Sequence, residues 1–362
     1  MGANKRVFYA IEKAGIAPLG STTYTSIRGL QTIGLNTTFN LEQVMEFGQA
    51  TIYENVEGIP NVEATLNKVL DGFCPMYLLA TQSAQAANLL ARANASACSF
   101  VIGIYSDQQL AASGSVLTAV TCSGMYVSSA SYKVGVDGNA TEDITLVGNN
   151  KLWSGSNPTI NDTAGGAGTI LTGDDSPLSI TGSGGVNRRE DVLIGSLGSI
   201  FPSEIPGISS SGYLIINSDG SLPTHLRSIS VTANLGREDI FELGRKGNYY
   251  RYVKIPAEVT SEIGVLSSSG DMISALEEGA YSEGGSCGRY NLTNQRIVLK
   301  MCEGLIVDAG DKNKLQSVNW NGGGTDGSNQ ELVYSYRNFN DFIVYHPQDP
   351  NAGTSTFQYP GD

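Results

Sequence analysis

The sequence has few of the side chains that nucleic-acid binding requires. Its 362 residues include 22 Lys and Arg against 35 Asp and Glu, which gives a net charge of −13. A protein that holds nucleic acid by its phosphates needs clustered Lys and Arg, so this acidic chain is not expected to bind it in that way. Charged residues make up only 16% of the chain, below the usual quarter, which excludes long charged helices and coiled coils.

Catalytic and metal-binding motifs are also missing. The chain has only two histidines, His225 and His346, no H-x-x-x-H, no G-x-S-x-G and no cluster of Asp, Glu and His at metal-ligand spacing. We therefore predict no catalysis, no metal site and no cofactor. The five cysteines form an odd set without a C-x-x-C pair, which predicts buried reduced thiols rather than zinc ligands or disulfides. They are Cys74, Cys98, Cys122, Cys287 and Cys302.

Long apolar runs are absent. No stretch approaches the roughly 18 residues that cross a bilayer. The apolar stretch behind Lys5 and Arg6 is broken by Glu12 and Lys13, which is unlike a signal peptide. The sequence therefore predicts a soluble protein that assembles in a reducing cytoplasm, with no membrane partner.

What the chain does have is glycine and tyrosine, 44 and 17 residues, which is typical of turn-rich β structure. Alternating or apolar segments between turn signals predict strands, and Asp137-Gly138 and Asp326-Gly327 predict turns between them. The predicted strands are Val116–Tyr126, Ser131–Val136, Ile144–Val147, Ile297–Val307, Leu332–Tyr336 and Phe342–Tyr345.

The chain contains an internal repeat. A shift of 196 residues lays Arg28–Pro60 over Thr224–Pro256 without a gap, with eight identities in 33 positions where average composition gives roughly two. E-Q-V-M-E-F-G at Glu42–Gly48 and E-D-I-F-E-L-G at Glu238–Gly244 are one motif written twice. The identical pairs are Leu30/Leu226, Ile33/Ile229, Glu42/Glu238, Glu46/Glu242, Gly48/Gly244, Tyr53/Tyr249, Ile59/Ile255 and Pro60/Pro256.

Weaker matches extend the repeat. Cys122–Val127 lies over Cys302–Val307 at a shift of 180, and Glu142–Ile144 falls near Gln330–Leu332. Between the copies, Ser154–Gly185 is rich in Gly, Ser, Thr and Asp, as expected of a linker. We predict a first domain over 1–153, a linker over 154–185 and a homologous second domain over 186–362.

One helix is predicted in each copy, against one face of a sheet. Ser83–Ala95 is Ala-rich, free of Gly and Pro, and apolar on one side, which predicts a helix. Met272–Glu278 is the shorter candidate in the second copy. Pro60 and Pro256 sit inside otherwise extended runs and predict an edge, a bulge or a hairpin end there, because proline cannot donate to a central ladder.

Leu35–Glu54, L-N-T-T-F-N-L-E-Q-V-M-E-F-G-Q-A-T-I-Y-E, resembles the N-terminal region of major tail tube proteins of tailed bacteriophages, and the likeness returns from Ile229. The resemblance implies a mainly β (α+β) fold of two tandem β-sandwich or half-barrel domains, each with a short flanking helix. Family members form six-domain rings that stack into a tube for the genome. Because this chain carries two domains, three chains would build one ring.

The resemblance also implies where function would lie. A negative lumen repels phosphates and lets DNA pass without binding. Partners would be copies of the chain itself, the tail terminator, baseplate and tape-measure proteins, and a sheath, in virions assembled in the host bacterial cytoplasm. Tyr53–Leu66 and Tyr249–Ile263, with Pro60 and Pro256, are the predicted hairpins to the next ring. The predicted lumen carboxylates are Glu42, Glu46, Glu54, Glu63, Glu238, Glu242 and Glu258.

Three other classes compete with a tail tube protein. One is another virion component of the same fold, such as a baseplate hub or tail terminator, which would be present in far fewer copies. Another is a β-sandwich surface binding module, for which abundant Tyr and Gly would serve binding. The last is an enzyme on a β scaffold, which the missing site disfavours. His225 has Gly29 as its counterpart in the first copy, so no repeated catalytic residue exists there.

Overall fold

The computed structural model confirms a mainly β chain. It describes residues 9–82, 86–89, 97–106, 116–154, 158–161, 167–171, 177–181, 185–195, 198–215, 224–267, 270–271, 273, 292–302, 305–322 and 329–345. Within these ranges the only α-helix is α1, Met76–Thr81, beside two short 3-10 helices at Tyr9–Ile11 and Arg189–Asp191.

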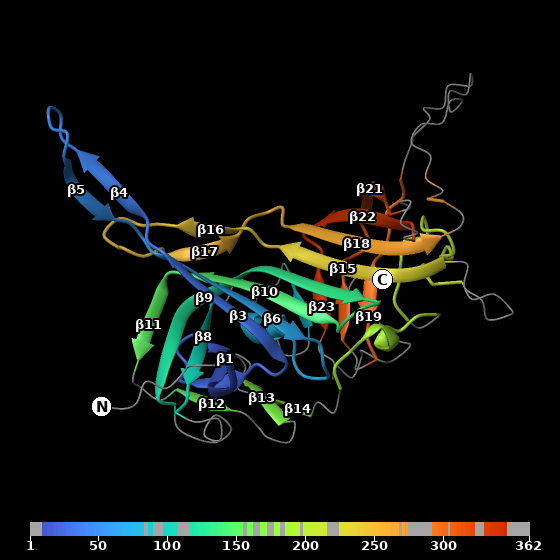
Figure 1. The fold of residues 1–362 in the computed structure, drawn as a ribbon, viewed down its shortest axis with the longest axis horizontal. Helices are drawn as coiled ribbons and strands as arrows, with labels where there is room; N and C mark the ends of the chain where they lie inside the picture. Colours follow the sequence, from blue (N-terminus) through green and yellow to red (C-terminus); the bar gives the residue numbers. More distant parts are fainter. Residues whose placement is uncertain are drawn as a thin grey trace.

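Eight antiparallel strands form the main sheet, which runs through both halves of the chain (Figure 1). Four strands come from the first half and four from the second, and β9 and β15 join them in the middle. In spatial order the strands are β3 (Leu30–Thr38), β6 (Asn61–Val69), β10 (Thr141–Gly148), β9 (Thr118–Gly135), β15 (Thr224–Asn234), β18 (Glu258–Ser267), β22 (Glu331–Phe339) and β21 (Lys314–Asn321).

Smaller sheets pack beside the main one. The N-terminal part of β9 continues into a second sheet of order β12-β2-β1-β8-β9, with β11 on its other side. A four-stranded sheet has the order β19-β20-β23-β7, and β13 and β14 form a hairpin. Their bounds are β1 (Glu12–Pro18), β2 (Thr23–Ser26), β7 (Ala86–Asn88), β8 (Cys98–Ile104), β11 (Asn150–Ser154), β12 (Thr159–Asn161), β13 (Ala167–Leu171), β14 (Pro177–Thr181), β19 (Val298–Lys300), β20 (Ile306–Asp308) and β23 (Ile343–Tyr345).

The two halves of the main sheet repeat each other in strand order, in register and in bulges. β3, β6, β10 and β9 correspond to β15, β18, β22 and β21. The pairing of β3 with β6 skips Gln31, and that of β15 with β18 skips Arg227, which is 196 residues later. A second bulge skips Ser128 of β9 and Gln316 of β21. Bulges are specific local features, so their recurrence shows that the sequence repeat is also a structural one.

The register corrects the weaker sequence matches. Val127 corresponds to Leu315 and not to Val307, because both face the same position of the neighbouring strand. Glu142 corresponds to Leu332, two residues beyond its predicted place. The strong block at Arg28–Pro60 contains the bulge and the hairpin, whose spacing is fixed. The later blocks are separated by loops that differ in length between the halves, so a single shift does not carry through.

The predicted helix at Ser83–Ala95 is wrong. Ala86–Asn88 is strand β7, which pairs with β23 of the second half, and Leu89 donates its backbone N–H to Phe342 O at 2.8 Å. The helix of the first half lies earlier, at α1. For the predicted helix Met272–Glu278, only residue 273 is described, and it is not helical. The range 154–185 holds the three short strands β12, β13 and β14, and β12 pairs in parallel with β2.

Most predicted strands are present with changed bounds. Val116–Tyr126 and Ser131–Val136 are parts of the single long strand β9, and Ile297–Val307 is divided between β19 and β20. The turn at Asp137-Gly138 is confirmed, with Gly138 at φ 88°. Asp326-Gly327 lies outside the described residues. Cys74, Cys98 and Cys122 are buried as predicted, whereas Cys302 is exposed, and Cys287 lies outside the described residues.

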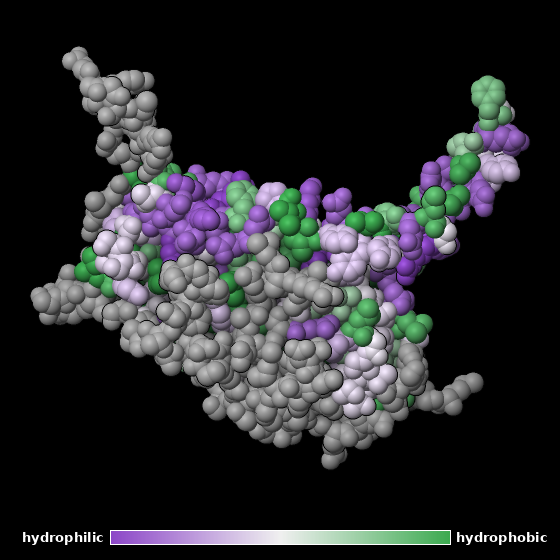
Figure 2. Space-filling view, turned by 180° about the vertical axis from the view of Figure 1, so that it is seen from behind, coloured by the Kyte–Doolittle hydropathy of each residue, from purple (hydrophilic) through white to green (hydrophobic). Residues whose placement is uncertain are grey.

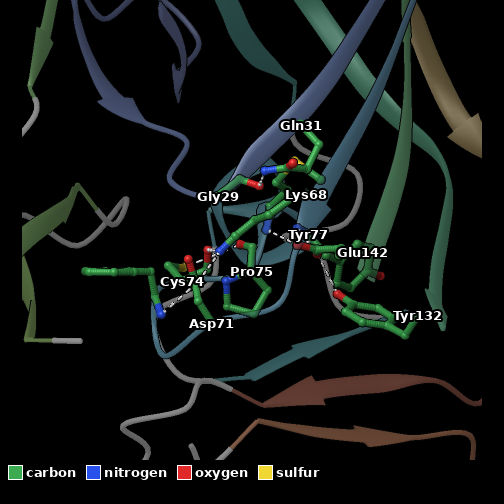
Figure 3. A network of polar contacts seen from close by, with 11 residues as sticks. Gly29, Gln31, Lys68, Asp71, Cys74, Pro75, Tyr77, Tyr132 and Glu142 are labelled. Carbon is green, nitrogen blue, oxygen red and sulfur yellow. Dashed lines mark hydrogen bonds and ion pairs between the residues drawn. The ribbon is translucent and has the colours of Figure 1, made fainter. Parts of the chain in front are cut away.

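A buried polar network anchors α1 to the sheet of the first half (Figure 3). The Glu142 carboxylate accepts hydrogen bonds from the backbone N–H groups of Met76 at 2.7 Å and Tyr77 at 2.9 Å, and from the Tyr132 hydroxyl at 2.7 Å. On the adjacent strand, Lys68 is also buried and its Nζ lies 2.7 Å from Asp71 Oδ1. Burial raises the pKa of Glu142, and the nearby Lys68 and the three donors oppose that shift.

Among the described residues, the second half has no counterpart of this network. Glu142 corresponds to Leu332, Lys68 to Val265 and Tyr132 to Trp320. Leu332 and Val265 are buried apolar residues at the positions of the buried charges. The halves therefore share their strands and differ in how the core is filled.

Replacing the buried carboxylate should destabilise the chain. In Glu142→Gln, one of the donors loses its acceptor, and we expect the free energy of unfolding to fall by about 1–3 kcal/mol. Tyr132→Phe, which removes one donor and leaves the helix bonds in place, should cost less, about 0.5–1.5 kcal/mol. Urea denaturation followed by circular dichroism measures both. Equal stability of Glu142→Gln and the wild type would contradict the anchoring role.

The same carboxylate should give the chain a pH dependence. Because its pKa in the folded chain is raised above the ordinary 4.5, the folded state binds more protons than the unfolded state between those two values. The free energy of unfolding should therefore fall as pH rises from about 4.5 through the raised pKa, and stay level above it. The difference between the denaturation curves of the wild type and Glu142→Gln, measured across this range, isolates the effect.

Candidate assembly surfaces

One face of the main sheet is open and is lined by small polar side chains. Along each strand, residues on this face are exposed or half-buried, and the alternate residues fill the core. Cross-strand pairs such as Ser131 and Thr232, whose hydroxyl oxygens lie 2.8 Å apart, continue the face across the junction of the halves. Its Ser, Thr and Asn residues are Thr32, Asn36, Thr38, Asn61, Thr65, Asn67, Ser129, Ser131, Thr141, Thr145, Ser228, Ser230, Thr232, Asn234, Thr260, Ser317, Asn319, Asn321 and Ser335.

The open face is weakly charged, with an acidic excess. Two of its basic residues are held in ion pairs, Lys133 with Asp143 at 3.4 Å and Arg337 with Glu258 at 2.5 Å. Acidic residues outnumber basic ones by five to three. They are Glu63, Asp143, Glu258, Glu262 and Glu331, against Lys133, Lys314 and Arg337. Such a surface offers no cluster of cations that could hold phosphates.

Two hairpins extend from the same end of the sheet. The first, β4 (Leu41–Met45) with β5 (Ile52–Glu57), projects away from the body of the molecule, and all of its strand residues are exposed (Figure 1). Apolar and polar side chains are mixed along it (Figure 2). Phe47, in the loop between β4 and β5, is fully exposed. The second is β16 (Arg237–Ile240) with β17 (Tyr250–Val253).

The predicted hairpin ranges are displaced. Tyr53–Leu66 and Tyr249–Ile263 each begin in the second arm of a hairpin and end in a strand of the main sheet. Tyr53 and Tyr249 are exposed. Pro60 and Pro256 lie in the connections from β5 to β6 and from β17 to β18, where the sequence predicted an edge, a bulge or a hairpin end. The apolar pattern does not show where the hairpin ends and the strand of the main sheet begins, because apolar residues recur on both sides of that connection.

The structure divides the seven predicted lumen carboxylates between the hairpins and the sheet. Glu63 and Glu258 lie on the open face of the main sheet. The other five lie on the hairpins and are exposed, so the structure does not bring the seven together. They are Glu42, Glu46, Glu54, Glu238 and Glu242. Sequence reasoning missed Glu262 and Glu331, which the alternation along β18 and β22 places on the open face.

The β16–β17 hairpin packs on the first half of the chain. Arg237 Nε donates to Val127 O at 2.6 Å, and Arg251 donates to Asn149 Oδ1 at 3.1 Å. The rings of Tyr126 and Tyr250 meet edge to face, with centroids 5.9 Å apart. Burial lowers the pKa of Arg237 to about 10. The equivalent β4–β5 hairpin belongs to the first half, and its strand residues are all exposed in the part of the chain that the structure describes.

Aromatic packing and strand pairing join the halves. Seven residue pairs connect β9 and β15, from Gly135 opposite Ser228 to Ser129 opposite Asn234. Beneath them Phe342 of the second half is fully buried against two rings of the first half. Its centroid lies 5.6 Å from that of Tyr77 and 6.3 Å from that of Tyr132.

Each end of the main sheet is an edge strand. β3 pairs with β6 on one side, and β21 pairs with β22 on one side, and no other described strand pairs with either. β3 corresponds to β15 and β21 corresponds to β9, so the two edges are the counterparts of the two strands that meet in the middle. Trp320 on β21 is 54% exposed, whereas its counterpart Tyr132 is buried.

The described residues hold no group of three His, Cys, Asp or Glu that could bind a metal. None of the described helices has the length and hydropathy needed to span a bilayer. His225 is exposed on β15, and His346 lies outside the described residues.

No family model and no curated protein matches the sequence. Among solved structures, the chain is similar to a chain of the anti-feeding prophage baseplate, a sixfold symmetrised cryo-electron microscopy structure, with a TM-score of 0.31 and 13% identity. The likeness covers 42% of this chain and 98% of that one.

Phe342→Ala should weaken the junction of the two halves and lower the stability of the chain. Removing a buried aromatic side chain costs about 3–5 kcal/mol, so we expect a loss of that size in the free energy of unfolding. Phe339→Ala is the matched control, because Phe339 is 47% exposed and its removal should change the stability by less than about 0.5 kcal/mol. Chemical denaturation measures both. Equal losses in the two variants would show that Phe342 does not carry the junction.

Proposed function

We propose that this chain is a structural protein that closes head to tail into rings, and that the rings stack into the tail tube of a phage-type particle. The observation that carries the proposal is that the free edges β21 and β3 are the counterparts of β9 and β15, which already pair within the chain. A second copy can therefore add its β3 to β21 with the geometry that the chain itself displays. The likeness of Leu35–Glu54 to tail tube proteins supports the same function.

The pairing of β9 with β15 within the chain gives the register expected for the proposed pairing of β21 with β3 between copies. In the chain, Ser131 opposes Thr232, Tyr132 opposes Val231, and Ala130 opposes Ala233. The counterparts of these pairs place Asn319 opposite Asn36 of the next copy. Trp320 then opposes Leu35, and Val318 opposes Thr37.

Ring closure explains how such long edges can be tolerated. Unpaired backbone donors and acceptors along a strand invite pairing with other chains, and closing a sheet into a barrel removes them. The edges that pair are different from each other, so the contact is heterologous and forms a closed ring when the rotation per subunit fits. Three chains, each with two equivalent halves, give the six-domain ring that the family resemblance implies.

The open face of the sheet is the proposed lining of the channel. The opposite face is covered by the core and by the smaller sheets, whereas this one carries short hydroxyl and amide side chains with an acidic excess. Double-stranded DNA is a polyanion, and a lining without clustered cations lets it slide without being held. DNA in transit is therefore a passing cargo and not a bound ligand.

Cysteines at matched positions test the ring contact. In a Cys287→Ser, Cys302→Ser background, Asn36→Cys with Asn319→Cys should form disulfides between chains under mild oxidation, because directly opposed strand positions suit the bond. We expect dimers and trimers on non-reducing gels. Negative-stain microscopy should show six-lobed rings or tubes, with a mass of three chains per ring.

The control is Thr32→Cys with Ser317→Cys, on the same open face but several positions out of register. It should give no cross-link above the level of the single variants. Equal cross-linking of the two pairs would contradict the register. A wild-type chain that stays monomeric at high concentration would contradict the ring and favour another virion component or a binding module.

Charge reversal tests the channel. Glu63→Lys with Glu262→Lys should leave tube assembly unchanged, because both side chains face away from the core. Virions that carry this tube should lose infectivity, since six added cations per ring would bind the DNA. Glu63→Gln with Glu262→Gln is the matched control, because it removes the same two carboxylates without adding cations, and infectivity should be retained. Normal infectivity of the charge-reversal variant would exclude the open face as the lining.

A further inference from the structure

β11 of the first half and β23 of the second half are counterparts. Trp153 of β11 pairs with Val120, and Ile343 of β23 pairs with Asp308. The offset that aligns β10 with β22 also aligns Trp153 with Ile343, and the offset that aligns β9 with β21 aligns Val120 with Asp308. The pair β9–β11 of the first half therefore corresponds to the pair β20–β23 of the second half, beside the main sheet. β11 and β23 are the outermost strands that each half itself contributes there.

The two counterparts differ in what covers them. The outer edge of β23 is paired with β7, a strand that the first half contributes. Beside it, Phe342 is buried against Tyr77 and Tyr132, also of the first half. The second half is therefore completed by its neighbour, through one added strand and one inserted side chain.

β11 has neither of these partners within the described chain. It pairs with β9 on one side, and no other described strand pairs with its outer edge. Leu152, the counterpart of Phe342, is 59% exposed, and Trp153 is 62% exposed. An apolar edge strand of this kind is a ready site for strand addition.

We propose that β11 is a second contact surface between copies, at which Leu152 inserts beside Trp320 of the neighbouring chain. The proposal rests on the ring proposed above. Leu152 against Trp320 is then the counterpart of Phe342 against Tyr132.

The two contacts fit the same interface. Pairing of β21 with β3 brings Trp320 of one chain opposite Leu35 of the next. Within the chain, Val231 and Phe342 come from the same half, and both lie next to Tyr132 of the other half. Their counterparts Leu35 and Leu152 also come from one half, so both can lie next to Trp320 of the neighbouring chain. Three apolar side chains that are exposed or half-buried in the separate chain, Leu35, Leu152 and Trp320, would therefore be covered together.

Tryptophan fluorescence can follow this contact, because the chain has only two tryptophans, Trp153 and Trp320. In a Trp153→Phe background, the emission of Trp320 should shift to shorter wavelength as rings form. Leu152→Asp should abolish the shift and raise the concentration needed for ring formation at least tenfold. Leu152→Phe, which installs the side chain found at the counterpart position, should restore assembly with the shift retained.

Leu19→Asp is the matched control, because Leu19 is 57% exposed in a turn away from β11. It should leave ring formation and the emission shift unchanged. Circular dichroism of each separate chain checks that Leu152→Asp is folded, which its exposure predicts.

Rings that form equally well with Leu152→Asp, and that retain the matched Asn36–Asn319 cross-link, would overturn the β11 contact and leave the ring itself standing. Rings whose Trp320 emission does not shift would also overturn it. A wild-type chain that forms no rings would overturn both proposals.

Discussion

Backbone hydrogen bonding at the edges of a sheet is the constraint on which this structure depends. Eight strands satisfy one another through the interior of the main sheet, and two rows of donors and acceptors are left at β3 and β21. The chain solves the same problem once internally, where β9 meets β15, and that solution is a template for the edges that remain. The positions of the hairpins, of the open face and of the apolar residues near the edges all follow from this order of strands.

Much of the strand framework could be predicted from the sequence because it follows from periodicity. The block from Arg28 to Pro60 has the same length in both halves, so its repetition was visible at a single shift. Helix propensity misled at Ser83–Ala95. An alanine-rich stretch favours a helix in isolation, yet here Ala86–Asn88 completes the sheet of the other half, and tertiary pairing outweighs the local preference.

The assembly surfaces were predicted less well, for a different reason. The predicted acidic residues belong mainly to the repeated motif, and that motif lies mainly on the hairpins. Which face of a strand is open depends on what covers the other face, and a sequence does not state this. Glu262 and Glu331 became recognisable only when the neighbours of β18 and β22 were known.

The covalent link between two unequal halves has a kinetic consequence. Half of the junctions in a six-domain ring would already be made when the chain folds, at the effective concentration of a tethered partner. Assembly of the proposed ring would then take two encounters in solution, where single-domain subunits would need five, so the reaction order of nucleation would fall. Because the buried charges around Glu142 occur in only one half of the described chain, the proposed ring would also have a threefold and not a sixfold pattern of subunit cores.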